Sequence, residues 1–176
     1  TLDALLDVTT KPQKEVNEQE VLNNLGAFGA PLGNYDEPKT KLTLEETLVR
    51  AVLLSQKNAT VARVLPVTLW LNRDKLDFKK AHYFAQKFNV TRAMGFYLDL
   101  TGNLSKDKKF NREAKMYSDK RYKHHTSFFT NSAQSKFSKQ LENKNTPEVA
   151  RKWKFTMNMN LDSFATLFKK FAHENG

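Results

Sequence analysis

The chain has 176 residues and a mass of 20.3 kDa, with 29 lysines and arginines against 19 aspartates and glutamates and no cysteine. Its length suits one domain, or at most two very small ones, and its 39% apolar content can supply a hydrophobic core, which excludes global disorder. The lack of cysteine excludes disulfides, thiolate metal sites and a cysteine nucleophile.

The net charge of +10 is concentrated in the C-terminal part of the sequence. Residues 1–105 carry 13 basic and 12 acidic side chains, whereas residues 106–176 carry 16 and 7. Such a basic half indicates an anionic partner, which could be nucleic acid, a membrane surface or an acidic protein. The alternative is compositional, because lysine outnumbers arginine 22 to 7, and Asn and Phe are also frequent, as in an A/T-biased gene.

The N-terminal part of the chain is acidic and leads into a loop. Positions 1–46 hold nine acidic and four basic residues. Residues 26–41 then contain three of the six glycines and two of the five prolines, which predicts a linker-like loop. We therefore divide the chain into an acidic helical arm with its loop, residues 1–41, and a helical body, residues 42–176.

The body begins with two predicted helices. Thr43 and Glu46 fit a capping box, and the apolar stripe behind them predicts a helix over residues 44–57. Residues 61–71 are apolar nearly all round, so we expect this segment in the interior. Pro66 predicts a kink that divides it into two helical pieces, and its valines leave a buried strand as the alternative.

The next segments predict an amphipathic helix and a second central one. Asp77 is the expected N-cap of the amphipathic helix. Residues 84–91 resemble a helix-turn-helix, with Asn89 in the tight turn and Thr91 as the second cap. Because the residues that would read bases are mostly apolar, two core helices joined by a short turn are favoured. Residues 93–100 lack a polar face and predict the second central helix.

The most basic segment lies at residues 106–125, where eight lysines and arginines and two histidines are interleaved with three aromatic residues. Such a mixture can neutralise phosphates and stack on unpaired bases. The competing interpretation is a solvated helix face whose aromatic side chains belong to the core. Together with a second basic cluster at 151–154, this segment supplies the predicted nucleic-acid-binding residues. They are Lys108, Lys109, Arg112, Lys115, Tyr117, Lys120, Arg121, Tyr122, Lys123, Arg151, Lys152 and Lys154.

The C-terminal quarter predicts a helix that begins near residue 147. Thr146 is its expected N-cap, with proline at the first helical position. Behind this start, Val149, Trp153 and Met157 recur every four residues. The spacing therefore predicts one helical face that runs as far as Met157.

The end of the chain predicts an amphipathic helix with Phe164 and Phe168 on its apolar face and Asn160 or Asp162 as its cap. The segments together predict an all-α fold. We expect a single compact domain of about six to eight helices, with two central apolar helices and the C-terminal amphipathic helix docked onto the body.

Sequence patterns of catalytic and metal sites are lacking. The chain has no Gly-rich phosphate loop ending in Lys-Ser/Thr, no Gly-x-Ser-x-Gly and no His-Glu-x-x-His. His124 and His125 are adjacent, so they point to different sides of a helix or strand and are poorly placed to hold one ion. We therefore predict no catalytic residue, no metal and no cofactor, and we disfavour an enzyme.

The chain also lacks membrane and targeting patterns. No apolar run approaches the roughly 18 to 20 residues of a spanning helix, and the sequence does not begin with a basic stretch followed by a hydrophobic one. We expect a soluble cytoplasmic protein.

The expected function is binding without catalysis. We predict a helical protein whose basic C-terminal half engages a polyanion, namely DNA or RNA, largely independently of sequence. The alternative is a helical protein-interaction or regulatory module whose basic face meets an acidic protein partner.

Overall fold

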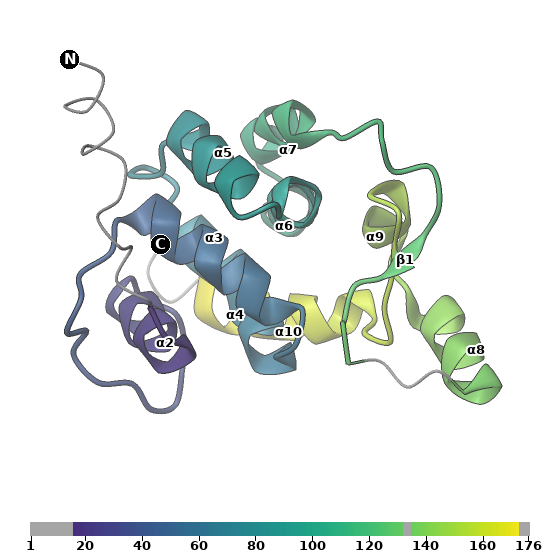
Figure 1. Cartoon of the computed structure of the whole chain (residues 1–176), viewed down its shortest axis with the longest axis horizontal. Coiled ribbons are helices and arrows are strands. Elements are labelled where there is room, and N and C mark those ends of the chain that lie inside the picture. Colours follow the sequence, from purple (N-terminus) through teal and green to yellow (C-terminus); the bar gives the residue numbers. More distant parts are fainter. Residues whose placement is uncertain (1–15, 132–134, 173–176) are drawn as a thin grey trace, which may run out of the picture.

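The computed structural model describes residues 16–131 and 135–172, and within these ranges the chain forms nine α-helices, one short 3-10 helix and a two-stranded parallel sheet (Figure 1). The predicted all-α fold is confirmed. Its helices are α2 (Glu18–Ala27), α3 (Leu44–Ser55), α4 (Ala59–Leu71), α5 (Phe78–Lys87), α6 (Thr91–Ser105), α7 (Lys108–Ala114), η1 (Lys115–Tyr117), α8 (Lys136–Asn145), α9 (Glu148–Lys152) and α10 (Leu161–Ala172); its strands are β1 (Thr126–Ser127) and β2 (Phe155–Thr156).

Several helices begin at the predicted caps. The Thr43 hydroxyl accepts a hydrogen bond from the Glu46 amide at 3.3 Å at the start of α3, while Asp77 caps α5 and Asn160 caps α10. The Glu46 carboxylate binds the Arg50 guanidinium one turn further on, at 3.0 Å. Local side-chain chemistry therefore defines where these helices start, as the sequence predicts.

The two apolar segments form the centre of the fold, as predicted. All ten residues of α6 from Ala93 to Gly102 are buried. The second segment forms α4, which packs against α3, α6 and α10. The prediction of two helical pieces divided at Pro66 is wrong, as is the alternative strand, because α4 is one helix with Pro66 inside it. Burial against three neighbouring helices outweighs the cost of a proline inside a helix, which is about 3 kcal/mol for the lost hydrogen bond and the steric clash together.

The loop predicted at residues 26–41 lies at residues 28–43, because Gly26 and Ala27 belong to α2 and α3 begins only at Leu44. This loop is attached to the helix before it. The Asn24 side chain donates to the Thr40 carbonyl and accepts from the Leu42 amide, both at 2.9 Å. Asn23 binds the loop in the same way, through the Asp36 amide. Helix α2 itself packs against α3 in the common core. The proposed boundary between residues 41 and 42 stays a prediction, and residues 1–15 lie outside the described ranges.

The helix predicted from Thr146 to Met157 is shorter than expected. Thr146 ends α8 instead of capping α9, and its hydroxyl accepts from the Met157 amide at 2.9 Å. Helix α9 ends at Lys152, and a positive φ of 63° at Lys154 turns the chain into β2, which pairs in parallel with β1. Val149, Trp153 and Met157 are nevertheless all buried, so the pattern identified core residues but not their backbone conformation.

Helix α10 crosses the molecule beneath α4, as the yellow ribbon in Figure 1 shows. Phe168 and Ala172 pack with Val67 of α4 in a small cluster of their own, and the Phe168 ring lies 6.3 Å from that of Trp70. The predicted docking of an amphipathic C-terminal helix is therefore confirmed.

Gly95 of α6 offers a test of this packing. A Cβ atom there would lie 2.5 Å from Cη2 of Trp153 and 2.8 Å from Cβ of Tyr117. Gly95→Ala should therefore lower the free energy of unfolding by about 1–3 kcal/mol, measured by urea denaturation. Gly33→Ala is the control, because a Cβ there meets nothing within 4 Å. Equal stability of the two variants would contradict the close packing at Gly95.

Candidate nucleic-acid interface

The structure brings the two predicted basic clusters together. Lys115 and Lys120 from the first cluster and Lys152 and Trp153 from the second line one hollow of about 380 Å³. A neighbouring hollow, also of about 380 Å³, shares Asn111, Lys115 and Lys152 with it. We call these two adjoining hollows the basic groove. Segments some 30 residues apart in the sequence thus contribute positive charge to one concave surface.

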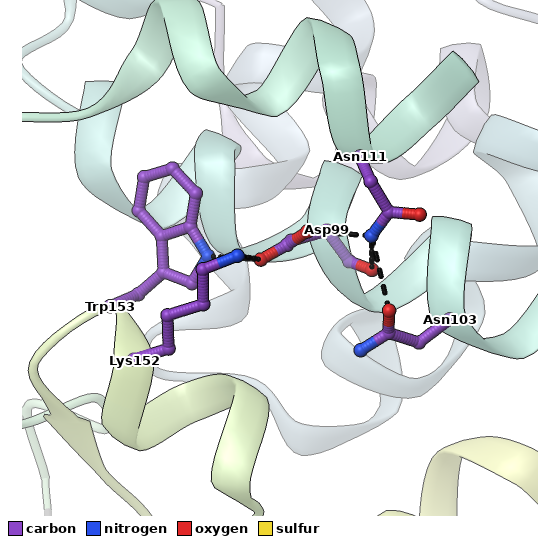
Figure 2. Close-up of polar contacts among 5 residues, drawn as sticks. All are labelled: Asp99, Asn103, Asn111, Lys152 and Trp153. Atoms are coloured by element: carbon purple, nitrogen blue, oxygen red, sulfur yellow. Dashed lines mark hydrogen bonds and ion pairs between the residues drawn. The ribbon is translucent and has the colours of Figure 1, made fainter. Parts of the chain in front are cut away.

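A buried aspartate connects residues that line the groove to the core. Asp99 lies on α6, and its side chain is 3% exposed. Its Oδ2 accepts hydrogen bonds from Lys152 Nζ at 2.7 Å and from Trp153 Nε1 at 2.9 Å, while Oδ1 accepts one from Asn111 Nδ2 at 2.6 Å (Figure 2). Asn111 also donates to Asn103 Oδ1 at 3.0 Å. These five residues, the Asp99 cluster, connect α7 and α9 to α6.

The donors around Asp99 keep it ionised. Burial is the largest single influence and would raise the pKa of this carboxyl group, but the hydrogen bonds from Lys152, Asn111 and Trp153 together outweigh it and hold the pKa below its usual value. Asp99 is therefore an ionised group with three hydrogen-bond donors, and these bonds hold α7 and α9 to α6. The Lys152 side chain remains 66% exposed although its ammonium group is paired with Asp99, and it lines both hollows of the groove.

A second set of contacts holds the segment between η1 and β1. The Arg92 guanidinium lies between the rings of Tyr122 and Phe155, at 3.8 and 4.0 Å from their centroids. It also donates to the Thr126 hydroxyl at 2.8 Å and to the Lys154 carbonyl at 3.3 Å. Cation–π contacts of this kind stabilise by about 0.5–2 kcal/mol each. Arg92 therefore links both basic clusters to the start of α6.

The structure also bears on the two interpretations of residues 84–91, a helix-turn-helix and two core helices joined by a short turn. Asn89 takes the turn with a φ of 55°, as predicted. Thr91 is the first residue of α6 and not its cap, and Val90 precedes it without a side-chain cap. Because α6 is buried and Arg92 is held by this chain, the structure agrees with the favoured interpretation of two helices joined by a short turn.

Most of the predicted binding residues are exposed. Lys108, Lys109 and Arg112 are exposed on α7. Lys123 is exposed between η1 and β1, and Arg151 is exposed on α9. Arg121 is exposed but pairs with Asp119 at 2.7 Å. Lys154 is half-buried at the turn into β2.

The aromatic members of the predicted set differ from expectation. Tyr117 is fully buried, and its hydroxyl donates to the Phe78 carbonyl at 2.7 Å. A base cannot stack on it in this conformation, so its assignment as a binding residue is wrong. Tyr122 is half-buried with Arg92 over its ring. The basic segment is helical only as far as η1, because residues 118–125 follow it without forming a helix.

Sequence reasoning missed Asp99, Asn103, Asn111 and Trp153 as groove residues. One signal was present: Asp99 is the single charged residue in the apolar stretch 93–100. A buried acid in such a stretch calls for a partner, because an unpaired buried charge is costly. Which residues supply that partner depends on the fold, since Lys152 and Trp153 follow 53 and 54 positions later.

Other site types find no support in the part of the chain that the structure describes. It contains no group of three or more acidic or histidine side chains that could hold a metal ion. Within the same residues, no helix is both long and apolar enough to cross a membrane.

Comparison with known proteins gives no family assignment. No protein-family model matches the chain, and neither a curated protein nor a solved structure matches it. The function must therefore be argued from the geometry of the basic groove.

Proposed function

We propose that this protein binds nucleic acid at the basic groove, without catalysis and largely independently of sequence. The convergence of Lys115, Lys120 and Lys152 on one hollow carries this proposal. Lys115 and Lys120 come from one segment and Lys152, which is also paired with Asp99, comes from another. Ammonium groups so placed can neutralise neighbouring phosphates, and the released counterions favour binding.

The groove favours phosphate contacts over base reading. Its charges are lysines, which act as point charges and carry little sequence information. Three of the arginines nearby are engaged within the chain: Arg92 stacks between two rings, Arg121 pairs with Asp119, and Arg151 donates to the Asn143 carbonyl, while Arg112 is exposed on α7. The guanidinium groups of these three arginines are thus less available for bidentate hydrogen bonds to guanine.

A binding assay tests the proposal. Protein treated with nuclease until its absorbance ratio is constant is titrated into labelled DNA and RNA of several unrelated sequences, and fluorescence anisotropy is recorded at about 50 mM salt. We expect saturable binding with affinities that differ by no more than a few-fold between sequences. No measurable binding at this salt concentration would contradict the proposal, as would strong preference for one sequence.

A further inference from the structure

A third hollow extends the basic groove toward α5. It has a volume of about 510 Å³, and its lining includes His82 and Gln86 of α5, together with Met116 and Arg121. It meets the basic groove at Ser118, which lines both. Helices α5 and α7 lie side by side (Figure 1), and the Phe78 and Phe110 rings are 5.7 Å apart. A concave surface therefore continues from α9 to α5.

An exposed aromatic ring lies on α5, close in sequence to His82 and Gln86, which line this third hollow. Tyr83 is 59% exposed and lies one helical turn from Gln86, which lines the hollow. Lys79 and Lys87, four residues before and after it on α5, are both exposed. The ring makes an edge contact with Phe84, with centroids 5.3 Å apart. Tyr83 thus offers a ring surface within a cluster of positive charge.

Basic side chains outnumber acidic ones along the surface only slightly: its lining contains Lys115, Lys120, Arg121 and Lys152 against Asp99, Asp119 and Glu148. Asp119 is the acidic residue that lines the third hollow, and it is paired with Arg121 at 2.7 Å. Glu45 of α3 is paired with Lys80 of α5, at 3.7 Å between the carboxylate and the ammonium group. The remaining lysines on α5 can therefore attract phosphates without competition from these carboxylates.

We propose that the ligand of the basic groove is a single-stranded nucleic acid, with its phosphates along Lys115, Lys120 and Lys152 and one of its bases stacked on Tyr83. This inference rests on the proposed function. A duplex keeps its base faces inside the helix, whereas a single strand exposes them to aromatic side chains. An exposed ring beside this surface can therefore stack on the bases of a single strand but not on those of a duplex.

The test compares single-stranded and duplex ligands. A labelled oligothymidine and a duplex of equal length are titrated with the wild-type protein, Tyr83→Ala and Tyr83→Phe. We expect Tyr83→Ala to weaken single-strand binding by about 5- to 100-fold, because stacking on one aromatic ring contributes this much. Tyr83→Phe keeps the ring and should retain the affinity, and duplex binding should change less than about twofold in either variant.

Phe137→Ala is the matched control. Phe137 is another exposed aromatic residue, 69% exposed, but it lies on α8, which contributes no residue to the three hollows, whereas Tyr83 lies on α5 with His82 and Gln86 of the third hollow. Its loss should leave both affinities unchanged. If the wild type binds nucleic acid but Tyr83→Ala loses no single-strand affinity, the stacking role is overturned while the proposed function stands. If the wild type binds neither ligand, both fall.

Discussion

Trp153→Ala should lower the free energy of unfolding by about 3–5 kcal/mol, the usual range for truncating a buried tryptophan. Trp153 is 8% exposed, its indole packs on Gly95, and its Nε1 donates to Asp99. The substitution removes both the packing and one donor of a buried carboxylate. Urea denaturation followed by far-UV circular dichroism measures the loss. A decrease below about 1 kcal/mol would show that the Asp99 cluster does not fasten α9 to the core.

Trp153→Phe separates the two contributions. It keeps most of the ring but leaves Asp99 with one donor fewer, so we expect a loss of about 1–3 kcal/mol in the free energy of unfolding.

The pH dependence of the free energy of unfolding gives a second measure of how much Asp99 stabilises the fold. Because the folded-state pKa of Asp99 is lowered, its stabilisation is fully present above the unfolded value of about 4 and is lost as pH falls through the folded value. Asp99→Asn should therefore weaken the decline in stability below about pH 4.

Replacing Lys115, Lys120 and Lys152 together by alanine should weaken nucleic-acid binding by about 100- to 1,000-fold at 0.1 M salt, since each phosphate contact contributes about 0.7–0.9 to the salt exponent. Fluorescence anisotropy measures the change. Lys152 also binds Asp99, so a Lys115→Ala/Lys120→Ala variant separates ligand binding from folding. This double variant keeps the Asp99 cluster and should lose about 30-fold.

A charge-matched variant controls for net charge. Lys41, Lys169 and Lys170 are exposed lysines on the 28–43 loop and on α10, outside the basic groove. Their joint replacement by alanine removes the same charge, but we expect an affinity loss of less than about fivefold, because distant exposed charges are largely screened. Equal losses in the two triple variants would contradict a localised binding site.

The sequence could predict the helices because their signals are local. Thr43, Asp77 and Asn160 cap the helices that they were expected to cap, since a cap depends on residues within one turn. The apolar stretch 93–100 likewise indicated a central helix, because a helix without a polar face must be buried. The same local reasoning failed at Lys154, where a positive φ and pairing with β1 end a helix that the side-chain spacing would continue.

The candidate site could be predicted only in part, because it is assembled by long-range contacts. Composition indicated the lysines, but Lys115 lies in η1, Lys120 in the turn after it and Lys152 at the end of α9. The same composition made Tyr117 a binding residue, although it packs into the core against α5. An aromatic side chain in a basic run is equally consistent with either role until its neighbours are known. No local sequence pattern predicted that residues of both α7 and α9 would contact Asp99.

The salt dependence of binding tests most directly whether the basic groove contacts phosphates. The logarithm of the association constant, measured for the wild type and for the Lys115/Lys120/Lys152 alanine variant, is plotted against the logarithm of the salt concentration. We expect a linear fall for the wild type and a slope that is shallower by about 2–3 in the variant. Identical slopes in the two proteins, or wild-type binding that does not respond to salt, would contradict nucleic-acid binding at this groove.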